Sequence, residues 1–132
     1  MEQQQETGDT AAGTTPAHRG PVGTWQERFR LPDGEFVSTV HLTPGGRAFI
    51  LRGPAPGGNG AGTWEPHGES GFAYRIAERL VDEDGAYAGW VDIDHRAELD
   101  GDTFTSSGTS AVYDAEDNLT VRVQVEASGS RV

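Results

Sequence analysis

The chain has 132 residues, and its 10 basic and 21 acidic side chains give a formal net charge of −11. This length allows one domain with one modest core. Because cysteine and lysine are both absent, disulfides, thiolate metal sites, cysteine nucleophiles and Schiff-base catalysis are excluded. The acidic surface repels a phosphate backbone, so we expect no nucleic-acid partner.

The first 20 residues are expected to form a disordered tail, followed by a single domain over residues 21–132. After Met1 the tail is composed of small, polar and charged residues, which cannot bury enough surface to offset the entropy of ordering. The sequence shows neither the basic start of a signal peptide nor a run of about 20 apolar residues. We therefore expect a cytoplasmic protein with no membrane partner.

Short alternating runs cut by Gly, Pro and Asp turn signals predict β-strands from residue 22 onward. In the first run, 22–31, Trp25, Glu27 and Phe29 share one face, and Pro32-Asp33-Gly34 then turns the chain. Seven further strands are predicted over residues 36–42, 47–52, 61–65, 71–81, 87–99, 103–113 and 119–127. The Gly/Pro-rich stretch 53–60 is expected to be a flexible loop at one mouth of the barrel.

The fifth run, 71–81, contains Ala-Tyr-Arg-Ile-Ala-Glu-Arg-Leu, which helix propensity would also allow. The alternation of Phe72, Tyr74 and Ile76 favours a strand. The whole pattern predicts an all-β fold, an eight-stranded antiparallel up-and-down β-barrel that follows the disordered tail. A closed barrel of this kind has one concave interior, where a small ligand can bind.

Three polar residues interrupt the inward-facing apolar pattern and are the candidate catalytic groups: Glu27, Glu78 and His95. A carboxyl in a poorly hydrated pocket has a raised pKa and can exchange a proton near neutrality, with an imidazole as its partner. Tyr74 shares a face with Glu78 and could donate a hydrogen bond to a developing enolate. This set suits proton transfer, dehydration or a cyclisation that needs no cofactor.

Each candidate also has a purely structural interpretation. Glu27 could pair with an interior arginine or face a wet mouth, Glu78 could be a solvated rim residue, and His95 could be a satisfied interior histidine. No metal site is expected, because Asp92 and Asp94 alternate away from His95. No cofactor is expected either, since Gly57-Gly58-Asn59-Gly60 lacks the residues that complete a phosphate loop.

The large apolar residues of the inward faces are the candidate ligand-binding residues. They are Trp25, Phe29, Val40, Trp64, Phe72, Ile76, Val91, Ile93 and Phe104. Trp90 instead shares a face with Asp92, Asp94 and Arg96, so it is predicted to lie at the rim or in a dimer contact. Together with an open seam between the first and last strands, it is the basis for a predicted homodimer.

Gly23-Thr24-Trp25, opening the first strand after a tail, resembles the Gly-x-Trp start of the calycins, the lipocalin and avidin-like barrels. The resemblance implies an arginine near the last strand that packs over the tryptophan, and Arg122 is its candidate counterpart. The chain is also similar in size, aromatic interior and absence of cofactor motifs to small barrel cyclases of bacterial natural-product pathways. That resemblance implies catalysis chiefly by shape, in which the barrel holds a flexible substrate near its reactive geometry.

Three functions remain open on the sequence. The first is a cofactor-independent cyclase or isomerase acting on an apolar small molecule such as a polyketide intermediate. The second is a non-catalytic carrier that uses the same cavity. The third is a solid-cored interaction domain whose partner surface is marked by Trp90.

Overall fold

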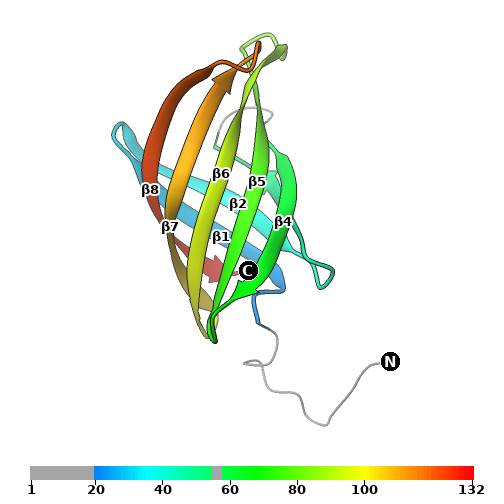
Figure 1. The fold of residues 1–132 in the computed structure, drawn as a ribbon, viewed down its shortest axis with the longest axis vertical. Helices are drawn as coiled ribbons and strands as arrows, with labels where there is room; N and C mark the ends of the chain where they lie inside the picture. The colour runs from blue at the N-terminus through cyan, green and yellow to red at the C-terminus, as the bar shows by residue number, and fades with distance from the viewer. Residues whose placement is uncertain (1–19, 55–57) are drawn as a thin grey trace.

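The computed structural model describes residues 20–54 and 58–132, which form eight strands (Figure 1). They are β1 (Gly23–Leu31), β2 (Gly34–Leu42), β3 (Arg47–Arg52), β4 (Gly60–His67), β5 (Gly71–Val81), β6 (Tyr87–Asp100), β7 (Thr103–Asp114) and β8 (Leu119–Arg131). The prediction of an all-β chain is confirmed, and 71–81 is a strand. The predicted tail lies outside the described residues except for Gly20, and so does the centre of the predicted flexible loop.

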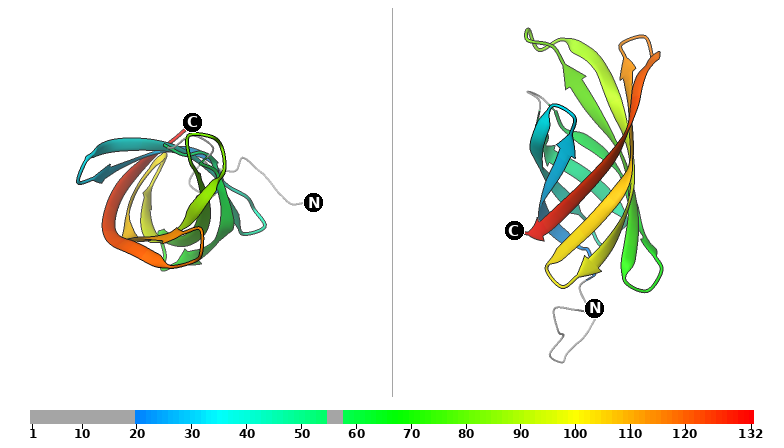
Figure 2. Two further views of the ribbon diagram at one scale, coloured as in Figure 1. Left: turned by 90° about the horizontal axis from the view of Figure 1, so that it is seen from above. Right: turned by 90° about the vertical axis from the view of Figure 1, so that its left-hand side faces the viewer.

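Each strand pairs antiparallel with the next, and β8 returns to pair with β1, so the barrel is closed (Figure 2). The β1–β8 ladder runs from Trp25 opposite Arg131 to Arg30 opposite Glu126. The expected open seam between the first and last strands is therefore wrong. The last strand also runs beyond its predicted end at residue 127, and Ser128, Gly129 and Ser130 continue the ladder with β1.

Strand β4 is also longer than predicted, since it runs on through Pro66 and His67. Proline lacks a backbone N–H and is tolerated only where no ladder hydrogen bond is needed. Pro66 and His67 pair with β5 alone, because the ladder between β3 and β4 includes only Gly60 to Thr63 of β4. The free edge of β4 thus accommodates Pro66 without loss of a hydrogen bond.

The up-and-down order places alternate connections at opposite ends of the barrel. The end of the barrel that carries the connections 32–33, 53–59, 82–86 and 115–118 is called the mouth. The opposite end is called the base. At the mouth, Asp82 and Asp114 each accept backbone N–H bonds within their own turns. None of the described residues forms a helix long and apolar enough to cross a membrane.

The base of the barrel is a solid aromatic core. Phe104 makes edge-to-face contacts with Trp25 and Phe72, at ring-centroid distances of 5.0 and 5.4 Å. Trp64 packs edge-on against Phe72 at 6.4 Å. A side chain at Gly129 would collide with the Phe104 ring, so this glycine leaves the space that the ring occupies. The large rings fill this end of the lumen and leave no room for a ligand there.

An arginine packs over Trp25 of β1, but it is not the expected one. The guanidinium of Arg131 lies 4.3 Å from the centre of the fully buried Trp25 ring and donates to the carbonyls of Val22 and Gly20. Arg122 is exposed and faces outward. The choice of Arg122 was wrong because β8 extends four residues beyond its predicted end and carries Arg131 to the base.

Trp90 lies on the outer face of the barrel, where its side chain is half-buried. Its ring stacks on Tyr113 at 4.8 Å and its indole N–H donates to Asp117. Contacts with Tyr113 and Asp117 of the same chain therefore hold the Trp90 side chain in place. The homodimer stays a prediction.

We expect Arg131→Ala to lower the free energy of unfolding by roughly 2–3 kcal/mol, because it removes a partly desolvated cation–π contact and charge-assisted hydrogen bonds. Arg122→Ala, on the same strand, is the matched control and should change it by less than about 0.5 kcal/mol. Urea denaturation followed by circular dichroism measures both. Equal losses in the two variants would show that Arg131 does not secure the base.

Candidate functional site

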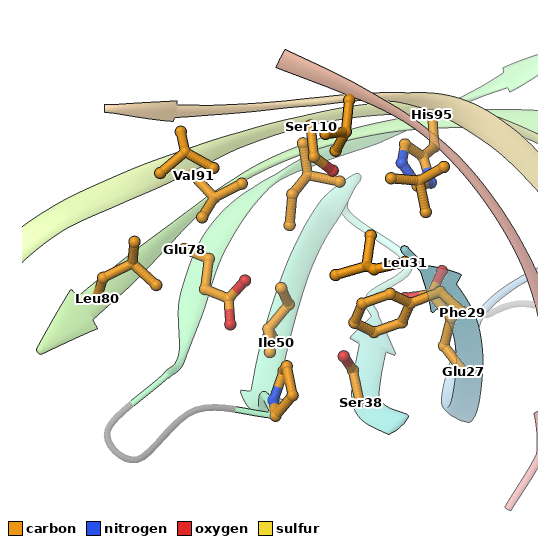
Figure 3. A pocket seen from close by; sticks show the side chains of 15 residues that line it. Glu27, Phe29, Leu31, Ser38, Ile50, Glu78, Leu80, Val91, His95 and Ser110 are labelled. Carbon is orange, nitrogen blue, oxygen red and sulfur yellow. The ribbon is translucent and has the colours of Figure 1, made fainter. Parts of the chain in front are cut away.

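A cavity of about 180 Å³ lies between the base core and the mouth (Figure 3). Its wall is mostly aliphatic, with Glu27, Glu78 and His95 as its titratable groups. The lining residues are Glu27, Phe29, Leu31, Ser38, Ile50, Pro54, Glu78, Leu80, Val91, Ile93, His95, Ser110, Val112, Val123 and Val125. Such a cavity makes the solid-cored alternative a poor description of this barrel.

The structure divides the predicted ligand-binding residues into two groups. Phe29, Val91 and Ile93 line the cavity. The others pack in the core beneath or beside it: Trp25, Val40, Trp64, Phe72, Ile76 and Phe104. Alternation along a strand shows which side chains point inward, but their height along the barrel depends on the tilt of the strands and the register between them.

Tyr74 joins the two sides of the barrel at the floor of the cavity. Its hydroxyl donates to Glu27 Oε2 at 2.5 Å, and it lies 3.2 Å from His95 Nδ1 and 3.3 Å from Ser106 Oγ. Glu27 belongs to β1, whereas Tyr74, His95 and Ser106 belong to β5, β6 and β7. Three of the four predicted catalytic residues are thus brought into one hydrogen-bonded cluster, which we call the Tyr74 cluster.

The sequence of β7 makes room for this cluster. Gly108 lies directly opposite His95 in the β6–β7 ladder, and a side chain there would lie 2.7 Å from the imidazole Cδ2. Two residues earlier, Ser106 supplies a small hydroxyl in reach of Tyr74. Larger residues at these positions would push His95 and Tyr74 out of the lumen.

Glu27 is 7% exposed, and Tyr74 is its only hydrogen-bond partner among the described residues. Burial raises the pKa of the Glu27 carboxyl, and the hydrogen bond from Tyr74 opposes that rise. Burial and the neighbouring Glu27 charge raise the pKa of Tyr74 well above its ordinary value, so the phenol stays protonated. The expected alternative of an interior arginine partner for Glu27 is not what the structure shows.

His95 is 4% exposed, and burial lowers its pKa to about 4, against a smaller opposing effect of Asp94. The imidazole is therefore neutral at physiological pH, with one N–H and one lone pair. Its Nδ1 lies near Tyr74, while Nε2 is buried and has no hydrogen-bond partner within the described part of the chain. Since His95 also lines the cavity, Nε2 can bond a ligand held there.

Glu78 lies apart from the cluster, on the mouth side of β5 (Figure 3). It is 7% exposed and lines the cavity, so it is not the solvated rim residue that the sequence allowed. A side chain at Gly53 would overlap its carboxyl, which shows how closely the β3–β4 connection approaches it. Burial, with a smaller effect of Glu27, raises the pKa of Glu78 to about 7.

Two buried hydroxyls were missed among the sequence candidates. Ser106 contacts Tyr74, and Ser38 lines the cavity directly opposite Glu27 in the β1–β2 ladder. Both share the inward parity of a predicted core residue, since Ser106 follows Phe104 by two positions and Ser38 precedes Val40 by two. This two-residue spacing from a core residue was the signal that could have identified both serines. Serines are common on strand faces, so their spacing alone did not distinguish them.

Among the described residues, no three His, Asp or Glu side chains lie close enough together to hold a metal ion. The site brings together two carboxyls, a phenol, a neutral imidazole and hydroxyls. These groups can accept, hold and return a proton at the wall of an apolar cavity.

No family model matches the chain, and no curated protein matches it. Among solved structures, a de novo designed fluorescence-activating β-barrel is similar, with 18% identity and a TM-score of 0.49. The alignment covers 90% of this chain and 100% of the designed one.

We expect Glu78→Gln to stabilise the protein increasingly as pH rises. A carboxyl whose pKa is raised on folding favours the folded state below its unfolded pKa of 4.5, and this contribution is lost as pH rises through about 7. Relative to the difference at pH 4.5, the variant should gain up to about 3 kcal/mol in free energy of unfolding by pH 8.

Urea titrations at a series of pH values test this expectation. Glu83→Gln, which removes an exposed carboxylate in the β5–β6 turn, serves as the matched control and should run parallel to the wild type. A difference between Glu78→Gln and the wild type that does not vary with pH would show that Glu78 is not desolvated.

Proposed function

We propose that the barrel binds an apolar small molecule in its cavity and acts on it as a cofactor-independent isomerase or cyclase. The observation that carries the proposal is His95 Nε2, a buried polar atom in the cavity wall that lacks a hydrogen-bond partner among the described residues. A buried polar atom left unpaired costs about 1–3 kcal/mol. A ligand that bonds Nε2 removes this cost and connects itself to the Tyr74 cluster.

The size and lining of the cavity limit what it holds. Dry apolar cavities of roughly 150 Å³ accept benzene, whereas sites for drug-sized ligands measure about 300–1,000 Å³. At about 180 Å³, this cavity accommodates one ring or a short branched chain. A longer substrate, such as a polyketide intermediate, would place only its reacting portion inside and extend through the mouth.

The Tyr74 cluster supports a proton relay between the ligand and Glu27. His95 takes a proton from the ligand at Nε2 and gives its Nδ1 proton to the Tyr74 oxygen, while the Tyr74 proton passes to Glu27. Reversal of the same transfers returns a proton to a different atom of the ligand. The net result is an isomerisation, or a ring closure in which the deprotonated carbon or oxygen attacks within the same molecule.

The apolar wall supplies the other part of the proposed catalysis. A flexible ligand confined against Phe29, Val91 and Ile93 loses orientational freedom before it reacts. A low-dielectric cavity also strengthens each hydrogen bond to the reacting atoms. Neither effect requires a cofactor.

A carrier is the second candidate, and one observation favours it. Tyr74 and Glu27 already satisfy one another, so the cluster can serve simply to hold the barrel walls together. In a carrier the ligand leaves unchanged. The two functions therefore differ in how strongly they depend on proton transfer at Glu27 and His95.

Complementation of a deletion strain separates these functions. If the protein is an enzyme, deletion in the source organism should replace a product with an uncyclised or isomeric precursor, detected by mass spectrometry. Glu27→Gln and His95→Gln should restore product formation at a rate lower by roughly 100-fold or more, because each removes a proton-transfer step. Glu83→Gln, the exposed control, should restore it fully.

Two outcomes count against the enzyme, and a third counts against the proton relay alone. Unchanged products at reduced yield, restored by both Glu27→Gln and His95→Gln, would establish the carrier. An unchanged profile would contradict any role for the cavity in small-molecule metabolism. Full restoration of an isomerised product by His95→Gln would contradict the relay. Each variant is purified from its strain and its circular dichroism spectrum recorded. A spectrum like that of the wild type excludes unfolding of the barrel as the cause of a lost product.

A further inference from the structure

We infer that the ligand of this cavity carries a basic nitrogen, and that its protonated amine pairs with Glu78 while the rest of the molecule extends toward His95. This inference rests on the proposed binding function and specifies its ligand class. It predicts discrimination against fatty acids and other anionic apolar molecules. The inference does not depend on whether the bound ligand is then isomerised.

The charge of the cavity wall is one-sided. Two carboxyls line it, at Glu27 and Glu78, and no arginine does; the chain has no lysine. Glu27 has a donor in Tyr74, whereas no hydrogen bond or ion pair to Glu78 is formed within residues 20–54 and 58–132. An anionic ligand would meet two carboxyls in a low-dielectric space, and a cationic ligand would pair with Glu78, which has no such partner among the described residues.

Among the described residues, the groups around Glu78 supply no competing cation. Its ladder neighbours are Gly60 on β4 and Val91 on β6, and Gly53 approaches from the β3–β4 connection. Across the lumen the titratable groups are Glu27 and His95, and the latter is neutral. Arg52 and Arg79 belong to nearby strand segments but are exposed and outside the lining.

The position of Glu78 also fits the route by which a cation would enter. Glu78 lies toward the mouth, whereas His95 and Glu27 lie deeper (Figure 3). The turns at the mouth carry Asp82-Glu83-Asp84 and Asp114-Ala115-Glu116-Asp117, which give this end an acidic border. Because a negative potential raises the local concentration of cations, the border favours an amine over a carboxylate before contact is made.

The test compares three probes that share one apolar body: 3-phenylpropylamine, 3-phenylpropanol and 3-phenylpropionate. Isothermal titration calorimetry at pH 8 and low salt gives their affinities for the full chain. We expect the amine to bind at least about tenfold tighter than the alcohol, and the carboxylate at least about 100-fold weaker than the amine. NMR shift changes at Val91 and Ile93 show whether each probe lies in the cavity.

Glu78→Gln is the decisive variant, since it keeps the shape of the site and removes its charge. It should bring the amine and the alcohol within about threefold of each other, while Glu69→Gln, at an exposed position in the base-end turn between β4 and β5, leaves the preference intact. In the wild type, the affinity for the amine should fall by up to about tenfold per unit as pH drops below 7, because a proton then competes for Glu78. The affinity for the alcohol should change little.

The outcomes distinguish a failure of this inference from a failure of the proposed binding function on which it rests. If none of the probes binds, the proposed cavity-binding function fails. If the alcohol or the carboxylate binds in the cavity as tightly as the amine, the barrel binds ligands but the inference is overturned. If the amine preference persists in Glu78→Gln, the recognition of the amine does not reside in Glu78 and the inference is likewise overturned.

Discussion

The hydrogen bond from Tyr74 to Glu27 crosses the lumen and divides the barrel into two parts. Beneath it, Trp25, Phe72 and Phe104 are buried and pack against one another in the base. Above it, the inward side chains become aliphatic and smaller, and a cavity remains. A phenol that does not ionise donates to the buried Glu27 carboxyl and opposes the rise in its pKa that burial causes. The floor of the cavity is therefore polar while its walls are apolar.

This division gives one molecule two separate properties. Stability comes from the base, where Arg131 covers Trp25 and ties the end of β8 to the start of the barrel. The proposed ligand chemistry belongs to the upper part, where buried titratable groups line the cavity. Such groups reduce stability near neutral pH, as the raised pKa of Glu78 shows. A protein that used its barrel only as a rigid scaffold would gain from apolar residues at these positions.

The fold could be predicted from the sequence because turn signals and alternation recur in every strand. The same alternation identified Glu27, Tyr74, Glu78 and His95 as inward-facing. It could not show that three of them meet, since that depends on the register across strands that are far apart in the sequence. The choice of Arg122 as the arginine over Trp25 was wrong, because the small residues after Ala127 gave no sign that the last strand continues to Arg131. Alternation also could not distinguish the aromatic residues that line the cavity from those in the core.

The most direct test of this account is the titration of His95, followed through the ¹⁵N shifts of its ring between pH 5 and pH 8. A buried imidazole bonded through Nδ1 to Tyr74 should remain neutral over this whole range, consistent with a pKa of about 4. Addition of an alcohol or amine that occupies the cavity should shift Nε2 more than Nδ1. A midpoint near 6.5, with no ligand effect on Nε2, would show that His95 is solvated and would contradict the cavity as described.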